Sequence, residues 1–368
     1  MTADVAAALD GDLERLRSHP YDPGEPFWRA ADEHHVDLLL LDRTRASGAD
    51  QAWSATARLR ARSAAVDASV LRSLRDRELR RILDVLGSAG VSCLIIKGAA
   101  LAHTLYGQPH TRRRSDADLL VRVDDADRVT ALLEAHGYAR AAEISGDYAT
   151  SQMHFDRPDC PDHRYALDIH WRIVNAHAFA DAIAFDELEA SRLPVPGLGA
   201  NAWTLCTPHA LALACMHCVA HHPNSDDLLW LWDVHLLASA MRDAESAVFV
   251  DLASRSAARA VCAYMLTAAH ARVRTPAAEP LIASVRPRAG DAVEATARFL
   301  GGRLSQADIL RSDLASLGWR HALSLLREHL FPPATYMRSL YDRWPGVLLP
   351  AAYLHRIVCG APKWLRRP

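Results

Sequence analysis

The chain has 368 residues, and its 42 basic and 44 acidic side chains leave a formal charge of -2. It is too long for one ordinary folding unit of about 100–200 residues, so two or three packed units are expected. The near-neutral charge disfavours a general nucleic-acid-binding surface. The sequence shows no secretory signal and no apolar run near the ~20 residues of a membrane span, and its seven cysteines lack regular spacing. These features predict a cytoplasmic protein with reduced cysteines.

The first expected unit, residues 1–88, has a helical pattern. In its last part, apolar residues recur at three- and four-residue steps, which is typical of an amphipathic helix. The proline-rich segment Pro20–Pro26 separates two shorter helical pieces, and residues 47–52 are expected to form a loop. We expect Gly87 and Gly90 to end the last helix.

The pattern then changes, and residues 89–195 are expected to form a small mixed sheet with helices. The expected strands are Val91–Ile96, Asp116–Val123 and Tyr165–Val174. Helices are expected from Gly98 and over Asp124–Gly137, and one more strand within 140–145 or 152–155.

Residues 196–330 return to a helical pattern, which Pro276–Pro287 interrupts. Residues 331–368 form a tail of proline, aromatic and basic residues that we expect to pack on the body as short segments. The predicted fold class is α+β.

Two aspartates in the second expected strand are the first candidates for chemistry. Asp116 and Asp118 are two residues apart, so on a strand both carboxylates project from the same face. Neighbouring carboxylates repel each other unless a cation lies between them, and Mg²⁺ favours one or two carboxylates plus phosphate oxygens. The alternative is an exposed edge strand with two solvated acids.

The residues before this pair are suited to bind a polyphosphate. Lys97, one of only two lysines in the chain, ends the first expected strand, and Gly98 opens the next helix. Glycine lets the backbone approach a phosphate closely, and a helix N-terminus attracts anions. Lys97 and Gly98 are therefore candidate nucleotide ligands. The alternative for Lys97 is a buried structural ion pair.

The loop that leads into the aspartates is basic. Arg112, Arg113 and Arg114 are followed there by Ser115. Arginine side chains could neutralise a triphosphate, so Arg112, Arg114 and Ser115 are further candidate nucleotide ligands. The alternative is a solvated loop, and we expect it to hold for at least one of the three arginines.

A third acid is needed in two-metal nucleotidyl transfer, where it holds the catalytic metal and activates the attacking hydroxyl. Asp168 is the best candidate, because in its strand Asp168 and His170 face one way while the apolar neighbours face the other. A strand-end acid in a surface pair is the alternative. His170, together with His217 and Asp233 from the helical region, is a candidate for the acceptor side of the site.

A second group of residues has the chemistry of metal ligands. Cys215 and Cys218 form a Cys-x-x-Cys pair that His221 and His222 follow, but the other half of a zinc site is missing. The surrounding alanines and leucines favour a core helix in which cysteine serves as a small hydrophobic residue. Motifs of serine hydrolases, dinucleotide-binding proteins and P-loop proteins are absent from the sequence.

These segments resemble the nucleotidyltransferase superfamily with the DNA polymerase β-type palm, and within it the poorly characterised bacterial branch of nucleotidyltransferase family proteins. The resemblance rests on Leu94–Leu101, Tyr106, Arg112, Ser115–Val121, His136–Tyr138 and Leu167–Trp171, and more weakly on Trp28–Leu41 and Leu330–Pro333. It implies a mixed-sheet palm at 89–195, with helical regions before and after it. Gly98 stands where better-known members have a Gly-Ser turn.

The resemblance also implies an activity, which is transfer of a nucleoside monophosphate from a nucleoside triphosphate such as ATP, with release of pyrophosphate. By motif match, Asp116, Asp118 and Asp168 become the carboxylates that hold Mg²⁺, with two ions expected and Mn²⁺ able to substitute. The acceptor would be a hydroxyl of a small molecule, peptide or protein. Relatives of this branch often accompany peptide-tailoring or exopolysaccharide genes, so such a pathway is expected.

Two other functions are compatible with the same fold. One is a non-catalytic nucleotide-binding or antitoxin-like module, against which the presence of all three acids and Lys97 argues. The other is an enzyme that adds nucleotides to RNA ends, which the near-neutral charge and the lack of a basic aromatic stripe disfavour.

Overall fold

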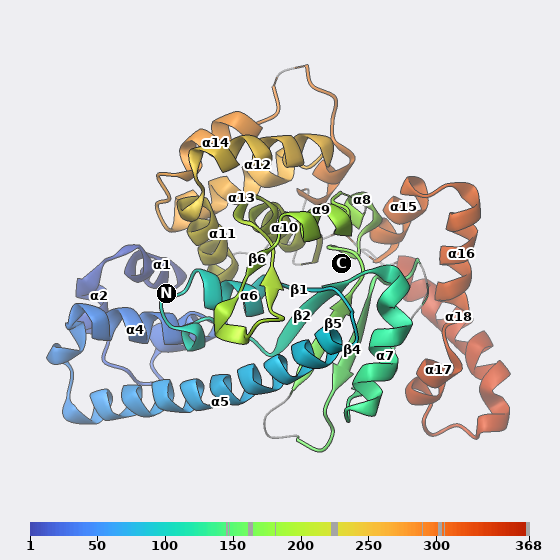
Figure 1. Ribbon diagram of the computed structural model, residues 1–368, viewed down its shortest axis with the longest axis horizontal. Helices are drawn as coiled ribbons and strands as arrows, with labels where there is room; N and C mark the ends of the chain where they lie inside the picture. The colour runs from blue at the N-terminus through green and yellow to red at the C-terminus, as the bar shows by residue number, and fades with distance from the viewer. Residues whose placement is uncertain are drawn as a thin grey trace.

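The computed structural model describes residues 1–144, 146, 148–160, 165–180, 182–221, 227–288, 290–300, 304 and 306–365. Within these residues the fold is α+β, as predicted, with helices around one mixed sheet of seven strands (Figure 1). No helix in this part of the chain is long and apolar enough to cross a membrane.

The strands lie in the order β3-β4-β5-β2-β1-β7-β6. Their bounds are Cys93–Ile96 (β1), Asp116–Val121 (β2), Ala139–Arg140 (β3), Gln152–Asp156 (β4), Ala166–His170 (β5), Leu193–Pro194 (β6) and Trp203–Thr204 (β7). β2 runs antiparallel to β1 and parallel to β5, and β5 runs antiparallel to β4. β2 and β5 are therefore direct neighbours, although a long stretch of chain separates them.

Helices surround this sheet (Figure 1). The N-terminal helices are Thr2–Asp10 (α1), Leu13–Ser18 (α2), Pro26–Glu33 (α3), Asp37–Ser47 (α4) and Ala55–Ser88 (α5). Between the strands lie Lys97–Thr104 (α6), Ala126–Ala135 (α7), His177–Ala180 (α8) and Phe185–Ala190 (α9). The C-terminal helices are Thr207–His221 (α10), Leu228–Ala240 (α11), Asp243–Arg255 (α12), Arg259–Arg272 (α13), Ala278–Val285 (α14), Gln306–Ser316 (α15), Trp319–Leu330 (α16), Ala334–Leu340 (α17) and Leu349–Leu365 (α18). Short 3-10 helices cover Ala49–Ala52, Pro109–Thr111, Val123–Asp125, Pro196–Leu198, Ala295–Leu300 and Gly346–Leu348.

The central strands are buried on both faces, because alternate residues enter two different cores. In β2, Leu119 packs into a core shared with α5 and α7, while Leu120 packs into a core shared with α10 and α11. Alternate residues of a strand share a face. Asp116 and Asp118 therefore lie on the same face as Leu120, toward α10 and α11.

The second of these cores also joins the two ends of the molecule. It contains buried residues from α1, α3 and α4 as well as from α10, α11, α12 and α13. In Figure 1, α5 runs along one side of the sheet and α10 to α14 lie on the other. The helices before and after the sheet thus pack as one body around the face that carries the aspartates.

Several element boundaries differ from those predicted. Gly87 lies inside α5, and only Gly90, with a φ of 72°, takes the left-handed conformation expected after a helix end. A Cβ at Gly87 would come within 2.7 Å of the Asn201 side chain, so this glycine permits a close contact. Of the two candidate regions for an extra strand, 152–155 lies in β4, whereas β3 is Ala139–Arg140 and shares only its last residue with 140–145. The predicted segment 140–145 extends to Ser145, which is outside the described residues.

The C-terminal third also departs from expectation at two places. Pro280 is the third residue of α14, where its missing N–H costs nothing because the first four N–H groups of a helix have no partner within it. The tail, expected as short segments, contains α17 and the 17-residue α18.

Candidate functional site

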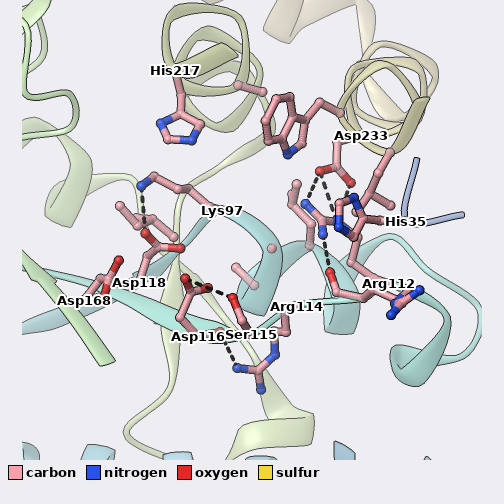
Figure 2. Close-up of a pocket in the computed structure, with 18 of the residues that line it drawn as sticks. His35, Lys97, Arg112, Arg114, Ser115, Asp116, Asp118, Asp168, His217 and Asp233 are labelled. Carbon is pink, nitrogen blue, oxygen red and sulfur yellow. Dashed lines mark hydrogen bonds and ion pairs between the residues drawn. The ribbon is translucent and has the colours of Figure 1, made fainter. Parts of the chain in front are cut away.

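A cavity of about 970 Å³ lies on the face of the sheet that meets α10 and α11 (Figure 2). Its wall includes the three predicted metal-site acids, Asp116, Asp118 and Asp168, and also Lys97 and Gly98. The other predicted site residues that line it are Arg112, Arg114, Ser115, His217 and Asp233. Residues from separate elements of the sheet and the helical region therefore border one space.

Strand register brings the three acids together. Asp118 of β2 pairs with Asp168 of the parallel strand β5, and Asp116 precedes Asp118 on the same face. Burial raises the pKa of the Asp116 carboxyl, and the charges of Asp118 and Asp168 raise it further. A cation held between these carboxylates would remove that repulsion.

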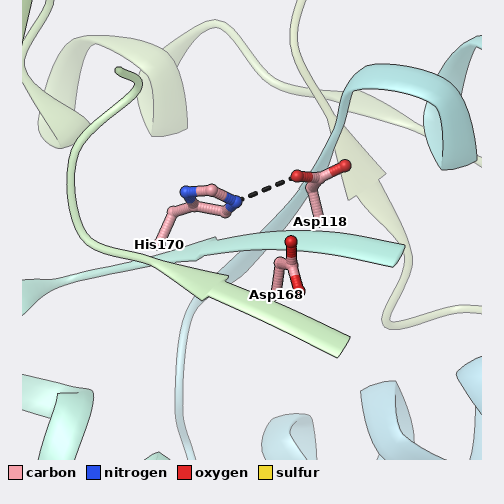
Figure 3. A group of neighbouring side chains, drawn as sticks. All are labelled: Asp118, Asp168 and His170. Atoms are coloured by element: carbon pink, nitrogen blue, oxygen red, sulfur yellow. Dashed lines mark hydrogen bonds and ion pairs between the residues drawn. The ribbon is translucent and has the colours of Figure 1, made fainter. Parts of the chain in front are cut away.

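Asp118 accepts hydrogen bonds from two side chains of the site. Lys97 Nζ donates a hydrogen bond to Asp118 Oδ1 at 2.7 Å, and His170 Nε2 donates to the same oxygen at 2.9 Å (Figure 3). Although burial opposes ionisation, Lys97 and then His170 hold the pKa of Asp118 well below its usual range. Burial, and then the charge of Lys97, lower the pKa of His170 itself, so His170 donates as a neutral imidazole.

The turn between β1 and α6 holds Lys97 in this position. Lys97 has a φ of 54°, in the left-handed region that residues with a Cβ rarely adopt. A Cβ on the next residue, Gly98, would lie 3.3 Å from the Arg112 guanidinium. Glycine at position 98 therefore lets the backbone lie close to Arg112. The positive φ of Lys97 is a strained backbone conformation.

Asp168 has a partner that the sequence analysis missed. His154 of β4 lies opposite Asp168 in the antiparallel pairing, and its Nδ1 is 2.6 Å from Asp168 Oδ1. This hydrogen bond raises the pKa of His154 to about 8. The only signal in the sequence was the predicted strand at 152–155, which could not show that it pairs with β5.

Arg112 and Asp233, predicted as a nucleotide ligand and an acceptor-side residue, form a buried ion pair. Arg112 Nη2 donates to Asp233 Oδ2 at 2.7 Å and Nε donates to both carboxylate oxygens, while the Tyr106 hydroxyl donates to Oδ1 at 2.7 Å. Arg112 Nη1 donates to the Arg113 carbonyl. These contacts favour a structural role for both residues, because they occupy the groups that a substrate would need. Arg113 also pairs with Asp37, at 2.9 Å.

Arg114 and Ser115 lie beside the metal-site acids. Arg114 Nη1 donates to the backbone carbonyl of Asp116 at 2.7 Å, and Nη2 donates to Asp76 of α5 at 2.8 Å. The Ser115 hydroxyl is 3.4 Å from Asp116 Oδ2. Both residues thus support Asp116 directly, and their predicted contact with a nucleotide remains a prediction.

The helix α10 contributes His217 to the cavity, and Figure 2 shows this ring on the side of Lys97 away from Asp118. Cys218 and His221 also line the cavity, but the metal-capable group found among the described residues does not include them. Burial raises the pKa of the Cys218 thiol well above its usual range, which disfavours the thiolate that zinc requires. His222 lies outside the described residues.

Side chains at this face of the sheet could hold a metal ion. Ligand atoms of Asp118, Asp168 and His170 lie within 4.8 Å of one another, and Asp116 adds a carboxylate on the same face of β2. Mg²⁺ prefers oxygen ligands, and His170 Nε2 is already donating to Asp118. That the three aspartates are the metal ligands remains a prediction, and His170 is placed to orient Asp118.

Comparison with known proteins identifies the family of the chain. A family model described as an uncharacterised nucleotidyltransferase matches residues 24–274. The chain belongs to this uncharacterised nucleotidyltransferase family. The search of curated proteins finds no match. Among solved structures, the chain is similar to JHP933 from Helicobacter pylori, at 19% identity and a TM-score of 0.30, over 70% of this chain and 98% of that one.

Membership of the uncharacterised nucleotidyltransferase family confirms the predicted family. The matched residues contain β1 to β7 and helices α3 to α13, so they include every residue predicted to hold the metal. Together with the metal-capable group, membership supports nucleotidyl transfer in general terms. It also implies a nucleoside triphosphate as substrate.

Proposed function

We propose that the protein is a magnesium-dependent nucleotidyltransferase that moves a nucleoside monophosphate from a nucleoside triphosphate to a hydroxyl group and releases pyrophosphate. The observation that carries this proposal is the convergence of Asp116, Asp118 and Asp168 from two adjacent strands onto one cavity that also holds Lys97. Neighbouring carboxylates repel one another, so three acids at one cavity favour a cation between them.

The three acids divide naturally between two Mg²⁺ sites. Asp116 and Asp118, from one strand, would hold both ions, and Asp168 would complete the site nearest the attacking hydroxyl. Mg²⁺, when bound, neutralises phosphate charge and makes the hydroxyl more acidic. Mn²⁺ would fit the same oxygen ligands.

Lys97 supplies a mobile positive charge for the nucleotide. Its ammonium lies 2.7 Å from Asp118, and its stem has enough freedom to turn from this carboxylate to a phosphate oxygen nearby. Gly98 leaves the backbone at the start of α6 open to the same phosphates. Thus Lys97 would stabilise the metal-free site and then help to hold the triphosphate.

The acceptor would enter from the side of α10 and α11. His217 lines this part of the cavity, and at 970 Å³ the cavity is large enough for a nucleotide and a small second substrate or a peptide segment. A small molecule, a peptide or a protein hydroxyl would serve, and participation in peptide tailoring or exopolysaccharide biosynthesis is consistent with this range.

Nucleotide-dependent stabilisation tests the binding half of the proposal. The melting temperature should rise with one or more of the four nucleoside triphosphates when Mg²⁺ is present, because a ligand at 100 times its dissociation constant adds about 2.7 kcal/mol. Asp116→Asn should abolish this shift, whereas Asp124→Asn, at an exposed position outside the cavity, should keep it. A metal-independent shift, or one that Asp116→Asn retains, would contradict the proposed site.

A further inference from the structure

Large apolar side chains are exposed at high density on the helices after residue 318. Of the 19 exposed large hydrophobic residues in the described part of the chain, ten lie between Trp319 and Val358. In Figure 1 these helices, α16 to α18, stand at one edge of the molecule. Exposed apolar side chains that gather in this way mark a surface for interaction with another molecule.

These helices are held to the rest of the chain by their other side. Glu328 of α16 accepts hydrogen bonds from the backbone N–H groups of Tyr148 and Ala149, at 2.9 and 2.7 Å. Leu325 of α16 and Met337 of α17 are buried. A helix of a soluble protein normally turns its apolar side chains toward the core. Here, many of the apolar side chains point away from the body instead.

The outer face of α18, which we define by Phe331, Trp344, Val347, Leu354 and Val358, is continuous. Leu354 and Val358 are about one helical turn apart, so they point the same way. The ring of Phe331 lies 6.2 Å from that of the residue before Leu354, and the ring of Trp344 lies 5.5 Å from that of the residue after it. Two exposed aromatic residues therefore flank Leu354. Val347 belongs to the 3-10 helix that directly precedes α18.

The same part of the chain carries an excess of positive charge. Residues 319–368 contain eight basic and two acidic side chains, whereas residues 1–318 contain 34 basic and 42 acidic ones. The near-neutral charge of the whole chain conceals this asymmetry. Arg343 is exposed directly before Trp344, and Arg338 is exposed on α17. Such an asymmetry indicates binding to an anionic partner.

The composition of the outer face of α18 discriminates between possible partners. A second copy of the chain would bring the same positive charge to the same face, so the two copies would repel each other. A nucleic acid would match the charge, but it would leave Val347, Leu354 and Val358 without apolar contacts, because phosphates and sugars are bound by polar groups. A bilayer of anionic lipids satisfies both properties. Apolar side chains enter the boundary between headgroups and acyl chains, and arginines meet the lipid phosphates.

We propose that the outer face of α18 binds the surface of an anionic lipid bilayer and holds the protein there. Leu354 and Val358 would enter the boundary of the acyl chains, with Trp344 at the level of the headgroups, where tryptophan is favoured. Arg338 and Arg343 would contact the lipid phosphates. This inference goes beyond the proposed function and does not depend on it, since none of these residues lines the cavity that contains the three acids.

Cosedimentation of the full chain with lipid vesicles tests the inference. Vesicles of phosphatidylcholine and phosphatidylglycerol, mixed at about three to one, should bind the protein. Vesicles of phosphatidylcholine alone should bind it at least about tenfold more weakly, because the attraction of the arginines is lost. Added salt should weaken binding to the anionic vesicles, since it screens the same attraction.

Matched variants separate the apolar from the charged contribution. Leu354→Ser, at a residue that is 64% exposed, should weaken vesicle binding by about tenfold, whereas Leu59→Ser, at a residue of α5 that is 69% exposed, should not. Arg343→Gln should weaken vesicle binding by about fivefold, and Arg62→Gln, at an exposed position of α5, should leave it unchanged. Val347→Ser, at a residue that is 83% exposed, provides a second apolar variant if Leu354→Ser lowers the melting temperature.

The inference is overturned if the anionic vesicles do not bind the wild type, or if the neutral vesicles bind it equally well. It is also overturned if Leu354→Ser and Val347→Ser both bind as the wild type does. In the absence of vesicle binding, binding of single-stranded RNA that Arg343→Gln weakens would assign the face to nucleic acid. A dimer that Leu354→Ser abolishes would assign it to a second copy of the chain.

Discussion

Asp116 and Asp118 stand two residues apart on β2, yet their electrostatic environments are opposite. Asp118 accepts hydrogen bonds from Lys97 and His170, at 2.7 and 2.9 Å. Asp116 is surrounded by the like charges of Asp118 and Asp168. From the sequence, asparagine at either position is expected to spare the fold, because each replacement removes like charge. The contacts in the structure support this prediction for Asp116 only, since replacing Asp118 also removes the carboxylate that Lys97 contacts.

The two asparagine variants should therefore differ in stability when metal is absent. Asp118→Asn should lower the free energy of unfolding by about 2–4 kcal/mol, because a buried ion pair is broken. Asp116→Asn should leave it unchanged or raise it. The signs follow from linkage: the lowered pKa of Asp118 means that its ionised form stabilises the fold at pH 7, and the raised pKa of Asp116 means the reverse.

Urea denaturation at pH 7, with a chelator present, measures the free energy of unfolding of both variants. Asp124→Asn, at an exposed position shortly after β2, is the control. As the pH falls, the stability that Asp118 contributes should be lost, and Asp118→Asn should approach the wild type. Equal losses for Asp116→Asn and Asp118→Asn would show that the contacts of Lys97 and His170 contribute nothing to the fold.

Replacement of Asp168 should affect the rate of transfer much more than the affinity for the triphosphate. In the proposed mechanism Asp116 and Asp118 suffice to hold the nucleotide through its metal, whereas the attacking hydroxyl depends on Asp168. Asp168→Asn should therefore keep triphosphate affinity within about tenfold while lowering the rate of the chemical step by several orders of magnitude. Calorimetry and single-turnover pyrophosphate release give the two quantities.

A near-normal rate in Asp168→Asn would mean that the third carboxylate lies elsewhere. Asp147, Asp156 and Asp233 are the next candidates by sequence. Asp147 lies outside the described residues, Asp156 is exposed at the end of β4, and Asp233 is occupied by Arg112. Asp168 is thus the best placed of the four, with Asp118 as its direct neighbour in the sheet.

The sequence could predict the acids of the site but not their partners. The spacing of Asp116 and Asp118 sets their common face whatever the rest of the fold, and polar residues alternate with apolar ones around Asp168. His154 reaches Asp168 only because β4 pairs with β5 in one register. Such long-range pairing leaves no mark in local composition, so His154 could not be selected from the sequence.

At the level of elements, the buried pair of Arg112 and Asp233 joins the sheet region to the helical region. Arg112 follows the 3-10 helix Pro109–Thr111, and Asp233 lies in α11. The side chains are 8% and 6% exposed, so each would be an uncompensated buried charge without the other. This connection positions α11 over the cavity.

Asp233→Asn should consequently destabilise the protein by about 3–5 kcal/mol, the usual cost of breaking a buried pair. Replacing both residues, as Arg112→Met with Asp233→Leu, should recover a large part of that loss because no isolated charge remains. A double-mutant cycle in urea gives the coupling energy. Independent, additive effects of the two single replacements would contradict the assigned pairing.

Most elements were predictable, and the exceptions have physical causes. The spacing of apolar residues predicts α5, β1, α7 and β5, because the buried faces of these elements are lined with apolar side chains. The sequence analysis did not select Arg72 and Arg75 as residues of the cavity wall, because charged residues on a helix such as α5 usually face solvent. Only the structure shows that α5 packs against the loop that contains Arg114. β6 and β7 have two residues each, which is too short for any periodic pattern.

At the scale of the whole molecule, helices from both ends of the chain enclose the face of the sheet that carries the three acids. The cavity is lined from β2, β5, α5, α6, α10 and α11 together. A reaction in this cavity would be shielded from bulk water by side chains from the sheet and from the helices on both sides of it. The account therefore predicts that the complete chain, and not the sheet region alone, is needed for transfer.

Label transfer tests the central claim most directly. The protein is incubated with Mg²⁺, a small-molecule and protein extract as a source of acceptors, and each triphosphate labelled at either the α or the γ phosphate. The account predicts that label from the α phosphate reaches an acceptor with release of pyrophosphate, that a chelator stops this, and that Asp168→Asn shows almost none. Transfer of the γ label, or Mg²⁺-dependent triphosphate binding without any transfer of the α label, would contradict it.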